Sequence, residues 1–194
     1  MEDKEQPFSP ADSLRVIHQT IEVAKRRVQE NGFYLLLWGT LVVIAGLWDF
    51  FIGWNSKNTI NPHLPWMLMP VVGVAATIVY EIRRQRTYVE RNTFNTLYGM
   101  IWLGYGITVP LLIMYVLKAD LNPTQPILAM TGFALFISGL VLQFRPIVAG
   151  AVVIWAGALL AIFTEPVWHS LIMAVATGIG YLIPGYLLNR SKRV

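Results

Sequence analysis

The chain contains no cysteine and few charged side chains. Only 13% of its 194 residues are charged, whereas a soluble domain carries about 25%. The absence of cysteine excludes disulfides, thiolate catalysis, zinc–thiolate sites and iron–sulfur clusters. The shortage of charge, together with a hydrophobic fraction of 55%, excludes an ordinary soluble fold.

The few charges divide the chain into six long charge-free runs, from 18 residues between Glu30 and Asp49 to 26 residues between Arg91 and Lys118. A helix that crosses a bilayer needs roughly 17 to 25 apolar residues, so each run predicts one span. We therefore expect an all-α, polytopic transmembrane helical bundle. The six predicted spans are Phe33–Ile52, Leu64–Tyr80, Leu97–Leu117, Ile127–Phe144, Ile147–Phe163 and Val167–Leu188.

Lysine and arginine lie almost entirely on one side of this alternating topology. Of the 15 basic residues, only Lys57 and Lys118 fall on the other side. The positive-inside rule then places both termini in the cytoplasm. Orientation and anionic lipid at the cytoplasmic face explain the net charge of +4, so we expect no nucleic-acid partner. The residues expected to contact lipid or a cytoplasmic partner are Lys25, Arg26, Arg27, Arg83, Arg84 and Arg86.

The residues before the first span predict an amphipathic helix over about Pro10–Glu30. Ser9 is a good N-cap and Pro10 suits the first helical position. Five apolar residues then recur at spacings of three and four, at Leu14, Ile17, Ile21, Ala24 and Val28. This narrow stripe favours packing on the anionic membrane surface or within the molecule over binding a dedicated partner helix. The predicted divisions are a cytoplasmic amphipathic helix over 1–31, a transmembrane domain over 32–189 and a cytoplasmic basic tail over 190–194.

A weak internal repeat links the odd-numbered spans. Asn31, Tyr34 and Trp38 recur at the same spacing as Asn95, Tyr98 and Trp102, whereas the fifth span keeps only Trp155 and Gly157. This pattern predicts three tandem helical hairpins in one orientation, as in some transporters. The alternative is that such aromatic and small residues belong to any packed membrane helix. Small residues four apart, as at Ala174/Gly178, support a compact bundle or a homo-oligomer without choosing between them.

Two groups of residues are candidates for ligand binding. Four aromatic residues lie deeper than the membrane surface, at Trp38, Trp102, Tyr105 and Trp155. Asp49 is the one aspartate, glutamate, lysine or arginine inside a predicted span, where burial costs at least about 2.5 to 3.5 kcal/mol. It either reaches the nearby outer surface or joins His63, Glu165 and His169 in a cation or proton site. The spacing of these four residues is not that of a metal site, and we expect no metal and no cofactor.

The sequence lacks the motifs of the common enzyme classes, and we expect no enzymatic activity. It has no phosphate-binding glycine loop, no metalloprotease histidine pair and no paired intramembrane aspartates. Ser138 and His169 superficially match an intramembrane serine protease. However, Phe136 stands where that family has glycine, and a rise of 1.5 Å per residue puts Ser138 roughly 16 Å and His169 only about 3 Å below the outer surface. A nucleophile and its base need about 3 Å between them.

The segment Glu30–Gly39, with the sequence ENGFYLLLWG, follows the amphipathic helix and precedes five further spans. In this arrangement the chain resembles an uncharacterised family of small six-span bacterial integral membrane proteins with an N-terminal amphipathic helix. The likeness extends to the ending Ile183–Leu188. Its motifs are structural, so the resemblance implies a fold but no catalytic or binding residues. Because such proteins accompany cytoplasmic transcriptional regulators, it implies at most a partner on the cytoplasmic side.

These observations lead to a non-enzymatic membrane protein. The leading hypothesis is a sensory or regulatory component that couples the bundle to cytoplasmic partners through the amphipathic helix and the basic loop. The rival is a small transporter or channel for an apolar or amphipathic solute, with a cavity that touches Trp38, Trp102 and Trp155. A structural partner of a larger membrane complex is a third alternative.

Overall fold

The computed structural model describes residue 14 and residues 32–54, 61–85 and 93–190. All regular elements within these ranges are helical, and six helices are long and apolar enough to cross a membrane. The prediction of an all-α bundle with six spans is confirmed. The elements are α2 (Gly32–Trp54), α3 (Leu64–Gln85), α4 (Thr93–Lys118), α5 (Thr124–Val141), α6 (Arg145–Ile162), η2 (Pro166–Trp168), α7 (His169–Thr177), η3 (Gly178–Leu182) and α8 (Ile183–Arg190).

Some of the predicted segments and residues fall outside the part of the chain that the structure describes. These are the amphipathic helix within 1–31 apart from Leu14, and the basic tail after Arg190. Lys25, Arg26, Arg27 and Arg86, together with the side chain of Arg84, lie outside it as well. Of the predicted lipid-contacting residues, only Arg83 is described, and it is exposed near the end of α3.

Helix α5 begins and ends three residues earlier than the sequence pattern predicted. At its start, the side-chain oxygen of Asn122 accepts a hydrogen bond from the backbone N–H of Thr124 at 2.9 Å. At its end, Gln143 adopts the left-handed conformation with φ of 51°, which a helix interior does not allow. The chain then turns within three residues into α6, so α5 and α6 form a tight antiparallel pair with the most extensive packing in the bundle.

The sixth span is assembled from four short pieces, η2, α7, η3 and α8. Its middle piece, η3, is a π-helix, a wide turn that occurs mostly as a single insertion in an α-helix and frequently at functional sites. Here the backbone of Gly180 lies directly against Gly150 on α6, where a Cβ on either residue would meet the carbonyl of the other. Two spans therefore touch backbone to backbone at this level.

Helix α2 is held against the last span by glycines spaced seven residues apart. A Cβ on Gly39 would lie 2.8 Å from Tyr181 Cβ, and one on Gly46 would lie 2.7 Å from the Ser170 carbonyl oxygen. Gly32 lies similarly close to α8. A repeat of seven residues keeps one helix face toward a partner along its whole length, and small residues on that face permit close backbone approach. We call this line of contact the glycine seam.

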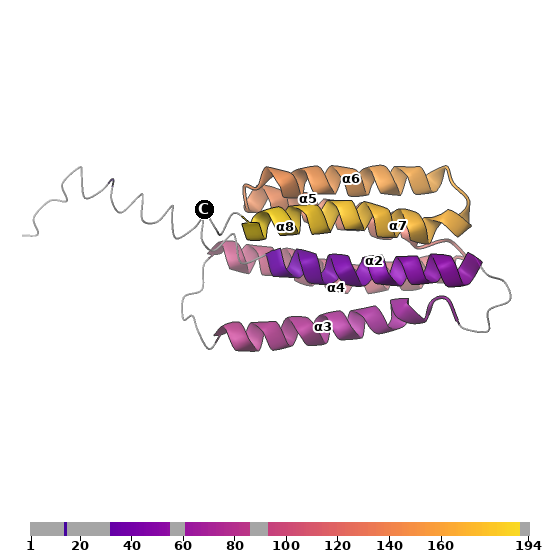
Figure 1. Ribbon diagram of the computed structural model, residues 1–194, viewed down its shortest axis with the longest axis horizontal. Coiled ribbons are helices and arrows are strands. Elements are labelled where there is room, and N and C mark those ends of the chain that lie inside the picture. Colours follow the sequence, from indigo (N-terminus) through magenta and orange to yellow (C-terminus); the bar gives the residue numbers. More distant parts are fainter. Residues whose placement is uncertain (1–13, 15–31, 55–60, 86–92, 191–194) are drawn as a thin grey trace, which may run out of the picture.

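Helix α3 lies at the lower edge of the bundle in Figure 1, and α4 lies behind α2 in this view. Helix α3 packs on α2 and α4 packs on α5, but along their described residues α3 and α4 have no extensive contact with each other. The two helices of each predicted hairpin do touch. However, the most extensive packing joins α5 to α6 and α2 to α7, which are helices of different predicted hairpins. The hairpins are thus not independent packing units.

The glycine seam predicts a position-specific effect of alanine. We expect Gly46→Ala to lower the free energy of unfolding by about 1 to 3 kcal/mol, because its Cβ would press on backbone atoms of α7. Gly53→Ala is the matched control, since its Cβ would meet only Pro62 Cβ at 3.8 Å. The measurement is thermal or denaturant unfolding in detergent. Equal stability of the two variants would contradict the seam.

Candidate ligand-binding groove

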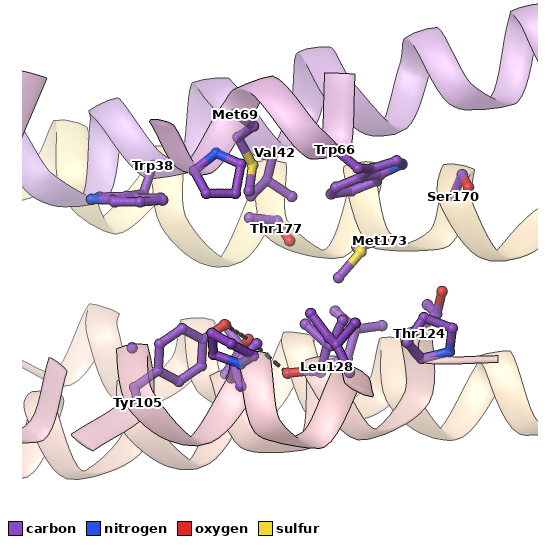
Figure 2. Close-up of a pocket in the computed structure, with 18 of the residues that line it drawn as sticks. Trp38, Val42, Trp66, Met69, Tyr105, Thr124, Leu128, Ser170, Met173 and Thr177 are labelled. Atoms are coloured by element: carbon purple, nitrogen blue, oxygen red, sulfur yellow. Dashed lines mark hydrogen bonds between the residues drawn. The ribbon is translucent and has the colours of Figure 1, made fainter. Parts of the chain in front are cut away.

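A cavity of about 2170 Å³ runs between the helices. Figure 2 shows α2, α3 and α7 contributing side chains to one wall, and α4 and α5 to the opposite wall. Small-molecule pockets usually measure roughly 300 to 1,000 Å³, so this space is large enough for an extended molecule. Helices α3 and α4 both line this groove, and along their described residues they have no extensive contact with each other.

The groove extends along most of the length of the spans. Tyr34 and Glu81 line one end, where the Tyr34 hydroxyl donates a hydrogen bond to the Glu81 carboxylate. Asp49, His63 and Asp120 line the other end. In the orientation that the sequence predicts, the end at Tyr34 is the cytoplasmic end of the groove and the end at Asp49 is its outer end. Both ends are polar.

The middle of the groove is lined mainly by aromatic and aliphatic side chains. Figure 2 shows Trp38, Val42, Trp66 and Met69 from α2 and α3 across from Tyr105 and Leu128 on α4 and α5. The ring of Trp38 packs on Gly73, where a Cβ would come within 2.7 to 2.9 Å of three ring atoms. The separation of α2 and α3 is thus set by one indole ring lying on a glycine.

A few polar atoms interrupt the apolar middle. The Thr131 hydroxyl donates to the Ile127 carbonyl at 2.7 Å, so the Tyr105 hydroxyl is the donor in its own 2.7 Å bond to Thr131. Within the described residues, the Thr77 hydroxyl is buried without a hydrogen-bond partner. Buried polar groups normally have such partners. Thr77 lines the groove, so a bound molecule could satisfy its hydroxyl.

Asp49 is buried at the outer end, with only 8% of its surface exposed. One carboxylate oxygen, Oδ2, accepts a hydrogen bond from the Ser170 hydroxyl on α7. The other, Oδ1, lies 2.8 Å from Nδ1 of His63, just before α3. Asp49 therefore faces the interior of the bundle, and the alternative that it simply reaches the outer surface is wrong. The seam explains its position, since Asp49 is one helical turn from Gly46.

The groove brings together five of the eight residues that the sequence singled out, namely Asp49, His63, Trp38, Trp102 and Tyr105. It does not include the other three. Trp155 lies between α5 and α6, where its indole N–H donates to the Ala129 carbonyl at 3.1 Å and its ring lies 5.3 Å from that of Phe136. Trp155 thus resembles Trp38 and Trp102 in sequence but not in position.

The remaining two candidates, Glu165 and His169, do not join Asp49. Glu165 is exposed, whereas His169 is buried. The Nε2 atom of His169 lies 3.2 Å from the backbone carbonyl oxygen of Thr164, five residues earlier in the chain. Across the described ranges, no group of three or more histidine, cysteine or acidic residues could hold a metal ion. Of the four residues predicted to form a cation or proton site, only Asp49 and His63 therefore lie together, and Ser170 contacts the same carboxylate.

Sequence reasoning missed several groove residues. One of them is Trp66, which lines the groove seven residues before Gly73, on the same face of α3. Ser170 is separated from Asp49 by 121 positions, and nothing local marks it. On α4, the groove-lining residues Gly99, Trp102, Gly106 and Pro110 recur at helical spacing, a periodicity that could have been found beforehand.

Comparison of the chain with family models, curated proteins and solved structures finds no match. The resemblance to a small bacterial family therefore stays a prediction. The chain is a polytopic membrane protein by the length and hydropathy of its helices. The groove is the feature of the structure that indicates a function.

The environment of Asp49 predicts an unequal effect of two serine substitutions. Ser170→Ala removes the hydrogen bond to the buried carboxylate, and bonds to charged groups contribute about 1.5 to 3 kcal/mol. Ser138→Ala is the control, because its hydroxyl only donates to the Ala134 carbonyl within α5, and its loss should cost about 1 kcal/mol or less. Denaturant unfolding in detergent measures both. Similar losses would contradict a special role for the Ser170 bond.

Proposed function

We propose that this chain is a non-enzymatic protein of the bacterial inner membrane that binds an amphipathic solute in the groove and carries it within or across the bilayer. Both termini lie in the cytoplasm in this proposal, and the chain groups with the small six-span bacterial membrane proteins that it resembles. The observation that carries the proposal is a groove with an apolar, aromatic middle and polar ends, lined by α3 and α4, which do not pack extensively on each other.

The residues that line the groove indicate which class of solute it can bind. Burial of an alkyl chain contributes about 0.8 kcal/mol per CH₂, and the middle of the groove offers Met69, Leu128 and Met173 to such a chain. A polar headgroup finds partners at either end. Because α3 and α4 do not pack extensively on each other, we propose that a solute dissolved in the bilayer enters between them without crossing water. An ion channel, by contrast, needs polar groups that replace the hydration shell along its path, and the apolar middle does not favour one.

The arrangement of Ser170, Asp49 and His63 supports a non-enzymatic role. In a catalytic triad the serine bonds to the histidine, and the histidine is oriented by the carboxylate. Here the Ser170 hydroxyl donates to Asp49 itself, and His63 contacts the other oxygen of the same carboxylate. No hydrogen bond joins Ser170 to His63 in the described part of the chain. Ser170 therefore lacks the histidine base of a catalytic triad.

A sensory or partner-coupling role rests on the amphipathic helix within 1–31 and on the basic loop after α3. These segments lie largely outside the described residues, so this role stays a prediction from the sequence. It is compatible with the groove, because a sensor also needs a site for its ligand.

Two glycines of α4 test whether the groove is the binding site. A Cβ on Gly104 or on Gly106 would meet nothing within 4 Å, so both positions accept a larger side chain, but only Gly106 lines the groove. We expect Gly106→Leu to weaken amphiphile binding about tenfold or more, since displacing two CH₂ groups from the wall costs about 1.6 kcal/mol. Gly104→Leu should change it less than about twofold.

Binding is measured by quenching of tryptophan fluorescence with a brominated alkyl alcohol, the protein being held in neutral detergent. Trp38→Phe and Trp102→Phe should each remove part of the quenching, because these rings line the groove. Trp155→Phe should not, because Trp155 does not. Equal effects of the two leucine variants, or quenching that depends on Trp155 alone, would overturn the groove as the binding site.

A further inference from the structure

Among the described residues, the aspartate, glutamate, lysine and arginine side chains that line the groove are all acidic. They are Asp49, Glu81 and Asp120, and no lysine or arginine of the described part lines it, although the whole chain has 15 basic and 11 acidic residues. A cavity walled by one sign of charge attracts ligands of the opposite sign. We propose, building on the function proposed above, that the solute carries a cationic ammonium headgroup that binds at Asp49.

Asp49 has the burial and the incomplete pairing that such a headgroup requires. It is 8% exposed, and a buried carboxylate is costly unless it is paired. Its Oδ2 accepts from Ser170, but Oδ1 has no hydrogen-bond donor, because His63 lies at contact distance without the direction of a hydrogen bond. His63 supplies an opposite charge only when protonated, and its side chain is 72% exposed. A cation entering the groove would complete the pairing.

Aromatic rings lie at the same end of the groove. Phe50 follows Asp49 directly, and its ring centroid is 5.7 Å from that of Trp54. Trp66 lies one helical turn after His63, and all three rings line the groove. Ammonium groups bind over aromatic faces, tryptophan best of all, with about 0.5 to 2 kcal/mol for each contact. This surface suits an alkylated ammonium group better than a small metal ion, for which the described residues offer no ligand set.

The groove also provides a path for the tail of such a ligand. From Asp49 and Ser170 at the outer end, Figure 2 shows Met173, Leu128 and Val42 leading toward Trp38 and Tyr105. A molecule with its headgroup at Asp49 would therefore lay an alkyl chain along the apolar middle. The proposed ligand class is an ammonium group on an apolar tail, as a free amphiphile or as part of a lipid.

The test compares ligands that share a ten-carbon chain. Labelled decyltrimethylammonium, decanol and decanoate are bound to protein immobilised in neutral maltoside micelles, with empty micelles subtracted. We expect the cation to bind about tenfold or more tightly than decanol, and decanoate to bind most weakly despite the net charge of +4. Decylphosphocholine separates the two sources: binding equal to that of the cation identifies a lipid-type headgroup, and weaker binding identifies a free ammonium.

Asp49→Asn should remove the preference for the cation, lowering its affinity about tenfold or more while decanol changes less than about twofold. Decanol binding then shows that the variant is folded. Glu165→Gln is the matched control, because it removes an acidic charge from a residue that does not line the groove. It should leave all affinities unchanged.

A second pair of variants keeps the proposal testable if Asp49→Asn does not fold. Trp54→Leu should weaken binding of the cation about threefold or more, whereas Trp48→Leu on the same helix should not, because Trp48 does not line the groove.

The possible failures are distinguishable. Unchanged cation binding in Asp49→Asn, tighter binding of decanoate, or displacement of the cation by millimolar sodium would overturn the headgroup site while leaving decanol binding and the groove intact. If none of the ligands binds the wild-type protein, the proposed function fails and the headgroup site with it.

Discussion

The close approach of α2 to the last span is the constraint on which the rest of the structure depends. In a bilayer, apolar helices gain no hydrophobic free energy from leaving lipid for one another, so association relies on tight packing and polar contacts. Gly39 and Gly46 allow that packing by exposing backbone to the atoms of Tyr181 and Ser170. The same contact brings Asp49 against the Ser170 hydroxyl. One line of glycines thus determines both the stability of this pair and the position of the buried carboxylate.

The groove follows from what this packing leaves out. The tightest contacts join α2 to α7 and α5 to α6, and they use the small residues of those helices. Helices α3 and α4 instead present Trp66, Trp102 and Tyr105 toward the interior. Such rings hold neighbouring backbones apart, because an indole needs space that only an opposing glycine such as Gly73 provides. Where no glycine lies opposite such a ring, the two backbones stay apart and the space between them forms part of the groove.

The number and order of spans could be predicted because charges interrupt the apolar runs, and the cost of burying a charge in lipid is large. The groove could not be predicted as well, because apolar residues face both lipid and interior in a membrane bundle and so do not mark the core. Trp155 and Trp102 have similar sequence surroundings, yet Gly132 accepts the ring of Trp155 between α5 and α6. By contrast, the seven-residue spacing of Gly32, Gly39 and Gly46 is visible in the sequence and indicates a helix face that packs closely. The partnership of Asp49 with Ser170 depends on the fold alone.

The way α3 is attached has a mechanical consequence. Its contacts with the bundle are made to α2 and run along that helix: Phe33 stacks on Tyr80 at a centroid distance of 3.9 Å, Trp38 rests on Gly73, and Asp49 meets His63. Because α3 packs on α2 and has no extensive contact with α4, the position of this wall of the groove depends on α2. A substitution that shifts α2 would therefore shift the α3 wall with it.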